Sequence, residues 1–380
     1  PIRGNSGCLI HVAEPLALGG WPRSVEVQGM HRQMGLILPI PRSLKCQRTL
    51  DTAARAKVLK PADEFNLVQI EVDGGNMTIA EYLERQSVAG LLVIQDGAVV
   101  YERYRLGNDR DTRWISYSVT KSVVSMLVGA AIQDGYIGSV DEKVTDYLPR
   151  LKGSAYEQAR IRDLLQMASG VAWDETYSDP DSDINQASWN TLELYDYLDD
   201  KPRNGQPGEL FNYNTAETNL AGNLLRAAIG NNLSTYLEQK IWQPFGMEAD
   251  AAWNLTEPGG GEFGGCCINA TLRDYGRLGL FALNNGRLAD GTPILPRDWM
   301  EQSTTPSRAA PYYGYFWWLP GNGAYRASGI FGQGIYIDPA ANLVIAQNSA
   351  RPDASRDEDR ELQARLFQTI VATLKRPLGE

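Results

Sequence analysis

A serine and a lysine stand three residues apart at the head of an apolar run, at Ser118 and Lys121. Three residues is close to one helical turn, so in a helix the hydroxyl and the ammonium lie on the same face. A hydroxyl in the first turn also lies near the positive end of the helix dipole. The pair therefore predicts a serine nucleophile whose proton is taken by a lysine of lowered pKa. The spacing alone also fits a helix-capping serine and a solvated lysine.

The rest of the residue inventory disfavours the common alternatives. The two histidines, His11 and His31, lie in an N-terminal stretch without clear periodicity, and no serine occupies a G-x-S-x-G turn. A Ser-His-Asp triad is therefore not expected. Zinc hydrolysis is not expected either, because the sequence has neither H-E-x-x-H nor spaced C-x-x-C pairs. We predict a mechanism that uses no metal and no cofactor.

Two further segments could complete such a site. Tyr213 precedes a predicted helix, and a phenol near an ammonium can ionise or relay a proton between Ser118 and a leaving group. The glycine-rich run 327–334 leads into a strand-like segment, and its backbone could join the Ser118 amide in an oxyanion hole. The alternatives are an amphipathic tyrosine at a domain junction and a bulge on an edge strand.

Composition bounds the class of protein. With 380 residues and 43% hydrophobic content, the chain can bury a large core in two domains or one composite domain. A net charge of -10 disfavours nucleic acid and anionic membranes as partners. No apolar run is long enough to cross a bilayer and no intact secretion signal is recognisable, so a cytoplasmic location is favoured, with periplasm or secretion left open.

The four cysteines are too few for disulfide bonds to stabilise the fold of a chain of this size. Cys266 and Cys267 are expected to be buried small residues and not a bridge. A disulfide between Cys8 and Cys46 stays open, and it would indicate an oxidising compartment.

The order of predicted elements indicates a sheet built from both ends of the chain around a helical insertion. A hairpin is predicted over 90–95 and 98–104, joined by Asp96-Gly97, and a buried helix over 118–134. The other predicted helices are 161–168, 190–199, 216–229, 233–242 and 359–375, and the other strands 313–319, 334–337 and 343–347. The predicted units are an extended arm at 1–60, a sheet domain of 61–115 plus 255–380, and a helical domain at 116–254, with the site between them.

Three motifs in this order resemble the serine beta-lactamase and penicillin-binding-protein superfamily, above all its class C branch. They are the S-x-x-K of Ser118, the tyrosine motif at Tyr213, and the run that starts at Ala327. The resemblance spans about residues 75–375, and family-like stretches also occur at 161–170, 244–247, 271–279 and 313–318. It implies an α/β (α+β) fold: an antiparallel sheet flanked by helices, with a mainly helical inserted domain.

The resemblance implies a role for each matching residue. Ser118 would be the acylated nucleophile, Lys121 its base and Tyr213 the proton shuttle, with the amides of Ser118 and Ile330 as the oxyanion hole. The chain departs from the family pattern twice. Thr215 stands where asparagine is common, and Ala327-Ser328-Gly329 replaces Lys-Thr-Gly. Without that ammonium, beta-lactam hydrolysis is expected to be inefficient.

Within the superfamily, the runs 328–333 and 174–180 look like those of the 6-aminohexanoate-dimer hydrolases and related carboxylesterases. The resemblance implies an ester or linear amide as the small-molecule substrate and leaves open a homodimer. A beta-lactamase or D-alanyl-D-alanine carboxypeptidase is one alternative, and a non-catalytic penicillin-binding-like sensor is another. The candidate substrate-binding residues are Tyr177, Asp181, Trp189, Trp317, Ser328 and Gly329.

Overall fold

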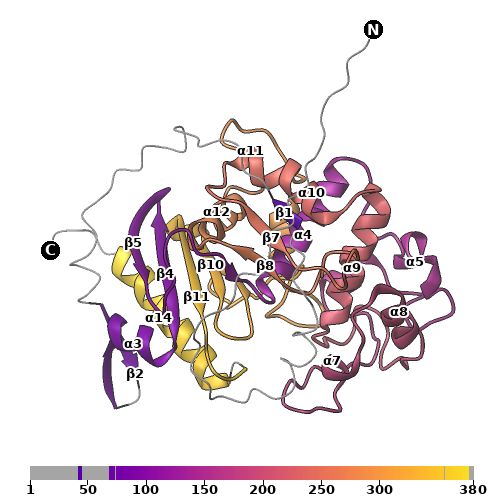
Figure 1. Ribbon diagram of the computed structural model, residues 1–380, viewed down its shortest axis with the longest axis horizontal. Coiled ribbons are helices and arrows are strands. Elements are labelled where there is room, and N and C mark those ends of the chain that lie inside the picture. Colours follow the sequence, from indigo (N-terminus) through magenta and orange to yellow (C-terminus); the bar gives the residue numbers. More distant parts are fainter. Residues whose placement is uncertain (1–41, 45–67, 73, 355, 376–380) are drawn as a thin grey trace, which may run out of the picture.

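A five-stranded antiparallel sheet is the largest β element of the computed structural model, which describes residues 42–44, 68–72, 74–354 and 356–375 (Figure 1). Its strand order is β5-β4-β11-β10-β9. The strands are β4 (Val88–Gln95), β5 (Ala98–Tyr104), β9 (Tyr325–Ser328), β10 (Gly334–Asp338) and β11 (Leu343–Ser349). The expectation of a sheet built from both ends of the chain is therefore confirmed.

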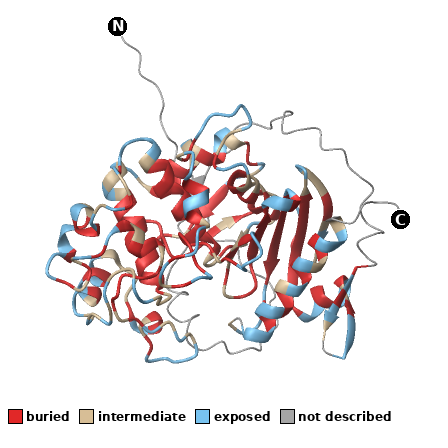
Figure 2. Cartoon of the chain, turned by 180° about the vertical axis from the view of Figure 1, so that it is seen from behind, coloured by how far each residue is buried: buried red, intermediate tan, exposed pale blue. Residues whose placement is uncertain are grey.

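Helices cover both faces of this sheet, which explains why β4 is apolar at nearly every position. Leu92 and Ile94 belong to the same core as α12 (Leu272–Leu283), whereas Leu91 and Val93 pack in a second core with α14 (Asp357–Lys375) and α3 (Ile79–Arg85). Successive side chains of a strand point to opposite faces, so a strand covered on both sides needs apolar residues throughout. Figure 2 shows the sheet almost wholly buried behind helices with exposed outer faces.

A second group of helices lies beside the sheet domain and surrounds the buried helix α4 (Val119–Gln133). Helix α4 packs against α9 (Thr215–Ile229) and approaches β9. The others are α5 (Val144–Tyr147), α6 (Ile161–Leu165), α7 (Asp183–Gln186), α8 (Thr191–Asp199), α10 (Leu233–Leu237), α11 (Gln243–Phe245) and α13 (Trp299–Ser303), with η1 (Pro149–Leu151) and η2 (Glu238–Trp242). The short η3 (Pro339–Ala341) instead connects β10 to β11 in the sheet domain and contacts α14. Over the described ranges, no helix has both the length and the apolar character that a membrane span needs.

Two smaller sheets complete the fold. One has the order β1-β7-β8-β6 and the other pairs β2 with β3. Their strands are β1 (Arg42–Leu44), β2 (Gln69–Val72), β3 (Gly75–Thr78), β6 (Trp114–Ile115), β7 (Ala251–Trp253) and β8 (Ile268–Ala270). Of the predicted arm at 1–60, only β1 is described, and it pairs with β7. Cys8 and Cys46 lie outside the described residues, and the domain boundaries stay a prediction.

The predicted hairpin and central helix are confirmed, but one predicted strand is wrong. At the hairpin turn Asp96 and Gly97 have φ of 50° and 75°, the positive values that a tight two-residue hairpin turn requires. The aromatic run 313–319 is irregular and makes only isolated bridges, because its backbone bonds elsewhere. The Tyr315 amide donates to the Ser303 carbonyl and the Phe316 amide to the Leu165 carbonyl, with Phe316 at a φ of 57°.

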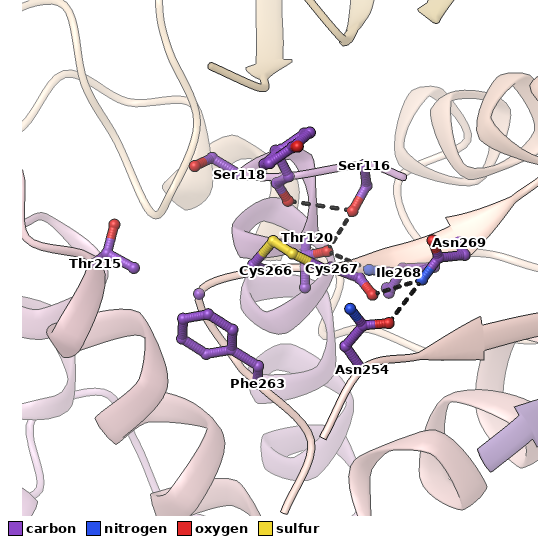
Figure 3. Close-up of a disulfide and its surroundings, with 12 residues drawn as sticks. Ser116, Ser118, Thr120, Thr215, Asn254, Phe263, Cys266, Cys267, Ile268 and Asn269 are labelled. Atoms are coloured by element: carbon purple, nitrogen blue, oxygen red, sulfur yellow. Dashed lines mark hydrogen bonds between the residues drawn. A yellow bond between two sulfur atoms is a disulfide. The ribbon is translucent and has the colours of Figure 1, made fainter. Parts of the chain in front are cut away.

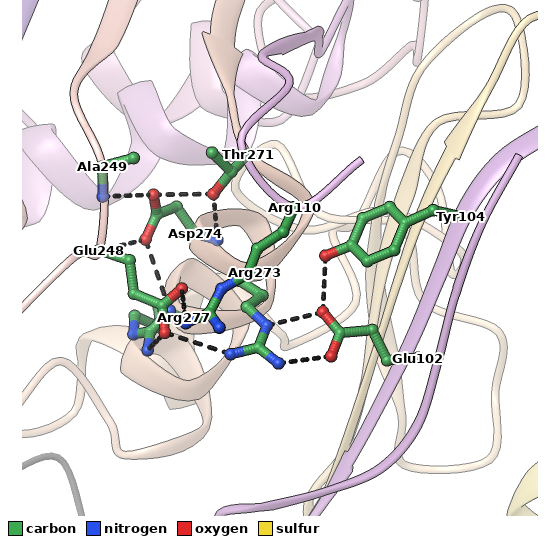
Figure 4. Close-up of polar contacts among 9 residues, drawn as sticks. All are labelled: Glu102, Tyr104, Arg110, Glu248, Ala249, Thr271, Arg273, Asp274 and Arg277. Atoms are coloured by element: carbon green, nitrogen blue, oxygen red, sulfur yellow. Dashed lines mark hydrogen bonds and ion pairs between the residues drawn. The ribbon is translucent and has the colours of Figure 1, made fainter. Parts of the chain in front are cut away.

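A polar network fixes α12 against the sheet and accounts for the family-like run 271–279 (Figure 4). Arg273 reaches Glu102 of β5 with two nitrogens, at 2.6 and 2.5 Å. Asp274 is fully buried and accepts from the backbone amides of Glu248 and Ala249 at 2.7 and 3.1 Å. These contacts hold α12 to both β5 and the loop before β7, so this family-like run has a structural role here.

Candidate active site

Ser118 and Lys121 meet at the start of α4, as their spacing predicts. Ser118 is the residue that precedes the first turn, and Lys121 Nζ lies 3.2 Å from Ser118 Oγ. The Ser118 side chain makes no capping hydrogen bond, and Lys121 is 1% exposed. The alternative of a capping serine and a solvated lysine is therefore wrong. The serine hydroxyl remains partly accessible while the amine beside it is enclosed.

The surroundings of Lys121 suit a base. Its Nζ also contacts the Thr215 hydroxyl at 3.1 Å and the Gly265 carbonyl at 2.7 Å. Burial penalises the charged ammonium and lowers the pKa of Lys121 to about 8, while the negative charge of Glu175 opposes this shift. Near neutral pH a usable fraction of the amine is therefore unprotonated and able to accept the serine proton.

Tyr213 lies beside the pair but is not a phenolate. The Lys121 Nζ is 5.4 Å from the centre of the Tyr213 ring. Burial raises the pKa of Tyr213 and the charge of Glu175 raises it further, against a smaller opposing effect of a hydrogen bond with Ser118. Of the two predicted roles, ionisation and proton relay, this shift favours relay by a neutral phenol, because burial disfavours the charged form. A neutral phenol bonded to the serine can still donate or relay a proton.

Glu175, which lies in the family-like run 174–180 and was not among the predicted site residues, organises this site. Its carboxylate accepts from the Thr215 amide at 3.0 Å, from the Thr215 hydroxyl, and from the Tyr177 hydroxyl at 2.6 Å. Thr215 in turn contacts Lys121, so a carboxylate, a hydroxyl and the amine form a chain. The signal available in the sequence was an acidic residue two places before Tyr177, inside a family-like run.

The loop 263–267 forms another part of the wall around Ser118 and carries a disulfide (Figure 3). Cys266 and Cys267 are buried, as predicted, but they are joined to one another, so the prediction of unbridged cysteines is wrong. The loop is tied to α4 where the Ile268 amide donates to the Thr120 hydroxyl at 3.0 Å. This anchorage places the Gly265 carbonyl on Lys121.

Two cavities meet at Ser118, and Tyr177 and Ile330 also line both. The inner one has a volume of about 30 Å³ and is lined mainly by apolar and aromatic side chains, including Ile184, Trp189 and Phe263. The outer one has a volume of about 740 Å³ and contains Tyr213, Ser328 and Gly329. The predicted oxyanion-hole residues Ser118 and Ile330 thus lie where the two cavities join, and the role of their amides stays a prediction.

The structure brings most of the candidate substrate-binding residues to these cavities but not two of them. Asp181 is exposed and lines neither cavity; Ile184 and Asn185, farther along the same segment, line the inner one. Trp317 is 1% exposed and packs on Tyr325, so it is a core residue and Trp318 forms the cavity wall. Asp181 and Trp317 are therefore corrections to the predicted site.

No group of three or more histidine, cysteine, aspartate or glutamate side chains suited to hold a metal occurs among the described residues. The groups gathered around Ser118 are an amine, phenols, a threonine hydroxyl and one carboxylate. They are suited to proton transfer and to nucleophilic attack by a hydroxyl.

The chain is similar to known proteins in sequence and in fold. The model of the Beta-lactamase family matches residues 76–368. The 6-aminohexanoate-dimer hydrolase of Paenarthrobacter ureafaciens is 27% identical over 321 residues, which cover 78% of this chain and 81% of that protein. A Bacillus anthracis structure described as a 6-aminohexanoate-dimer hydrolase superposes with a TM-score of 0.78 at 23% identity, covering 92% and 96% of the two chains. The hydrolase EstCE1, with promiscuous acyltransferase activity, gives 0.60 at 16% identity, covering 77% and 98%.

Proposed function

Because this chain belongs to the Beta-lactamase family of serine hydrolases, we propose that it cleaves ester or linear amide bonds through an acyl-enzyme. The observation that carries the proposal is the Lys121 amine, enclosed by protein and 3.2 Å from the Ser118 hydroxyl. An amine with a pKa of about 8 can take the hydroxyl proton at neutral pH. The hydrolase relatives named above support an ester or amide as the bond that is cleaved.

In the acylation step the Ser118 oxygen attacks the carbonyl carbon of the substrate and its proton passes to Lys121. The amides of Ser118 and Ile330 stabilise the negative oxygen that forms. Tyr213 gives a proton to the leaving oxygen or nitrogen and regains one from Lys121, and the bond to the leaving group breaks. Water then attacks the ester on Ser118, the acid is released, and the serine recovers its proton.

The two cavities assign the two ends of the substrate. Tyr213 lines the outer cavity and not the inner one, so the leaving group that it protonates lies in the outer cavity. The acyl group then occupies the inner cavity, whose volume of about 30 Å³ suits a very short chain. An acetyl ester is therefore the appropriate first substrate.

The proposal is tested with p-nitrophenyl acetate. Ser118→Ala and Lys121→Ala should each lose nearly all of kcat/KM, because members of one catalytic unit fail together. Circular dichroism spectra equal to those of the unmutated protein establish that each variant is folded. Hydrolysis by Ser118→Ala at the rate of the unmutated protein would refute the proposal.

The missing lysine supports ester or amide cleavage over beta-lactam hydrolysis. Ala327 occupies the position of that ammonium, and its side chain is 1% exposed and faces the core. A beta-lactamase is the second candidate, and turnover of a chromogenic cephalosporin at a kcat/KM above that for the acetyl ester would favour it.

A further inference from the structure

Arg326 is a cation on the wall of the outer cavity, and no carboxylate in the described part of the chain forms an ion pair with it. It lies on β9, two residues before Ser328, and both line this cavity. Tyr325 and Ala327 are buried while Arg326 and Ser328 are partly exposed, so the two latter side chains share the open face of the strand. Successive residues on one strand face are about 6.6 Å apart, which places Arg326 one step outward from Ser328.

No carboxylate or hydrogen-bond acceptor in the described part of the chain contacts the Arg326 side chain. The other charged groups of the cavity are on α14: Asp357 pairs with Arg360, and Glu361 is exposed. Burial lowers the pKa of Arg326, and the positive charges of Arg360 and Arg351 add to the effect. A partly enclosed guanidinium without a counter-charge is costly unless something binds to it.

The backbone holds Arg326 in place beside the aromatic wall of the cavity. The amides of Arg326 and Trp318 each donate to the other's carbonyl, at 2.8 and 2.9 Å. The Trp318 ring stacks with the rings of Tyr213 and Tyr312, with ring centres 5.7 and 6.4 Å apart. An apolar or aromatic leaving group can lie along these rings, with one end at Tyr213 and the other toward Arg326.

We propose that Arg326 is a specificity-determining residue that binds an anionic group, such as a carboxylate, on the leaving-group side of the substrate. The inference rests on the proposed function, because the proton donor Tyr213 identifies the outer cavity as the leaving-group side. A planar guanidinium can hold a carboxylate through two parallel hydrogen bonds. Arg326 directly precedes the buried Ala327, the position at which the family pattern has a lysine. Arg326 could therefore provide the positive charge that is missing at position 327.

Two acetyl esters that differ only in a remote charge test this inference: 4-acetoxyphenylacetate and its neutral amide, 4-acetoxyphenylacetamide. The unmutated enzyme should prefer the carboxylate ester in kcat/KM by about tenfold, as expected for a charge-assisted hydrogen bond. Arg326→Met should abolish this preference, and Arg326→Lys should keep part of it. Arg103→Met, which removes an exposed cation of β5, should leave it unchanged.

Inhibition gives a second readout that does not depend on turnover of the esters. The product 4-hydroxyphenylacetate should inhibit the unmutated enzyme at least tenfold more strongly than Arg326→Met. An equal preference for the two esters, or a preference that survives in Arg326→Met, would overturn the inference. If instead Ser118→Ala hydrolyses both esters at the unmutated rate, the proposed function itself fails.

Discussion

Replacing Glu175 by glutamine should shift the pH dependence of the reaction to lower pH. The carboxylate is linked to the Lys121 amine through the Thr215 hydroxyl, and two successive hydrogen bonds span about 5 Å. At an effective dielectric constant of about 20, a pair of unit charges at that separation interacts by about 3 kcal/mol, or about 2 pH units. Glu175 raises the pKa of Lys121, so losing its charge lowers that pKa.

The expected sign follows from the role of Lys121 as a base. Only the unprotonated amine accepts the serine proton, so kcat/KM should rise with pH through the Lys121 pKa, near pH 8 in the unmutated enzyme. In Glu175→Gln the rise should occur at about pH 6 to 7, allowing for solvent screening. The measurement is kcat/KM for p-nitrophenyl acetate between pH 5 and pH 9, corrected for spontaneous hydrolysis.

Glu209→Gln is the matched control, because this carboxylate is exposed in the loop before Tyr213 and contacts neither Lys121 nor Thr215. Its profile should coincide with that of the unmutated enzyme. Tyr213 and Tyr177 remain neutral over this range, since burial raises the pKa of each. A midpoint in Glu175→Gln that is unchanged or displaced to higher pH would refute the reasoning.

Four other substitutions distinguish residues of the site from residues of the core that supports it. Thr215→Val removes the hydroxyl that links Glu175 to Lys121 and should lower kcat/KM for the acetyl ester about tenfold; an unchanged value would show that the link is unimportant. Trp317→Ala should lower the free energy of unfolding by about 3–5 kcal/mol in urea titrations, whereas Trp318→Ala should mainly raise KM for aryl esters; the opposite pattern would contradict their assignment to core and cavity. Gly279→Ala should cost about 1–3 kcal/mol and lower Tm, because a Cβ there meets Val344 at 2.5 Å and Ile335 at 2.8 Å; an unchanged Tm would show that the core yields.

The contact between Ser118 and Lys121 could be predicted from the sequence because it depends only on helical geometry. The same holds for the hairpin at Asp96-Gly97, where the turn chemistry is local. Tyr213 is far from Ser118 along the chain, and only the resemblance to a family could bring the two together. Its protonation could not be inferred, because burial was unknown before the fold.

The wrong or missing predictions of site residues concern side chains whose orientation is set by tertiary contacts. In the irregular run 313–319, a one-residue difference decides whether Trp317 or Trp318 faces the cavity, and no periodicity determines it. Glu175 lies in a family-like run, but its role depends on its hydrogen bond with Thr215. The two residues are distant in the sequence, so only the fold shows this contact. Asp181 is exposed because the polypeptide turns there, and the short helix α7 directs Ile184 and Asn185 inward.

Trapping the acyl-enzyme tests the central claim most directly. The protein is mixed with p-nitrophenyl acetate, quenched in acid within the first turnovers and digested, and the acetylated peptide is located by mass spectrometry. The account predicts one acetyl group on Ser118, formed in the unmutated enzyme and nearly absent in Lys121→Ala at pH 7. Acetylation of another residue in place of Ser118, or equally fast labelling of Ser118 in Lys121→Ala, would contradict it.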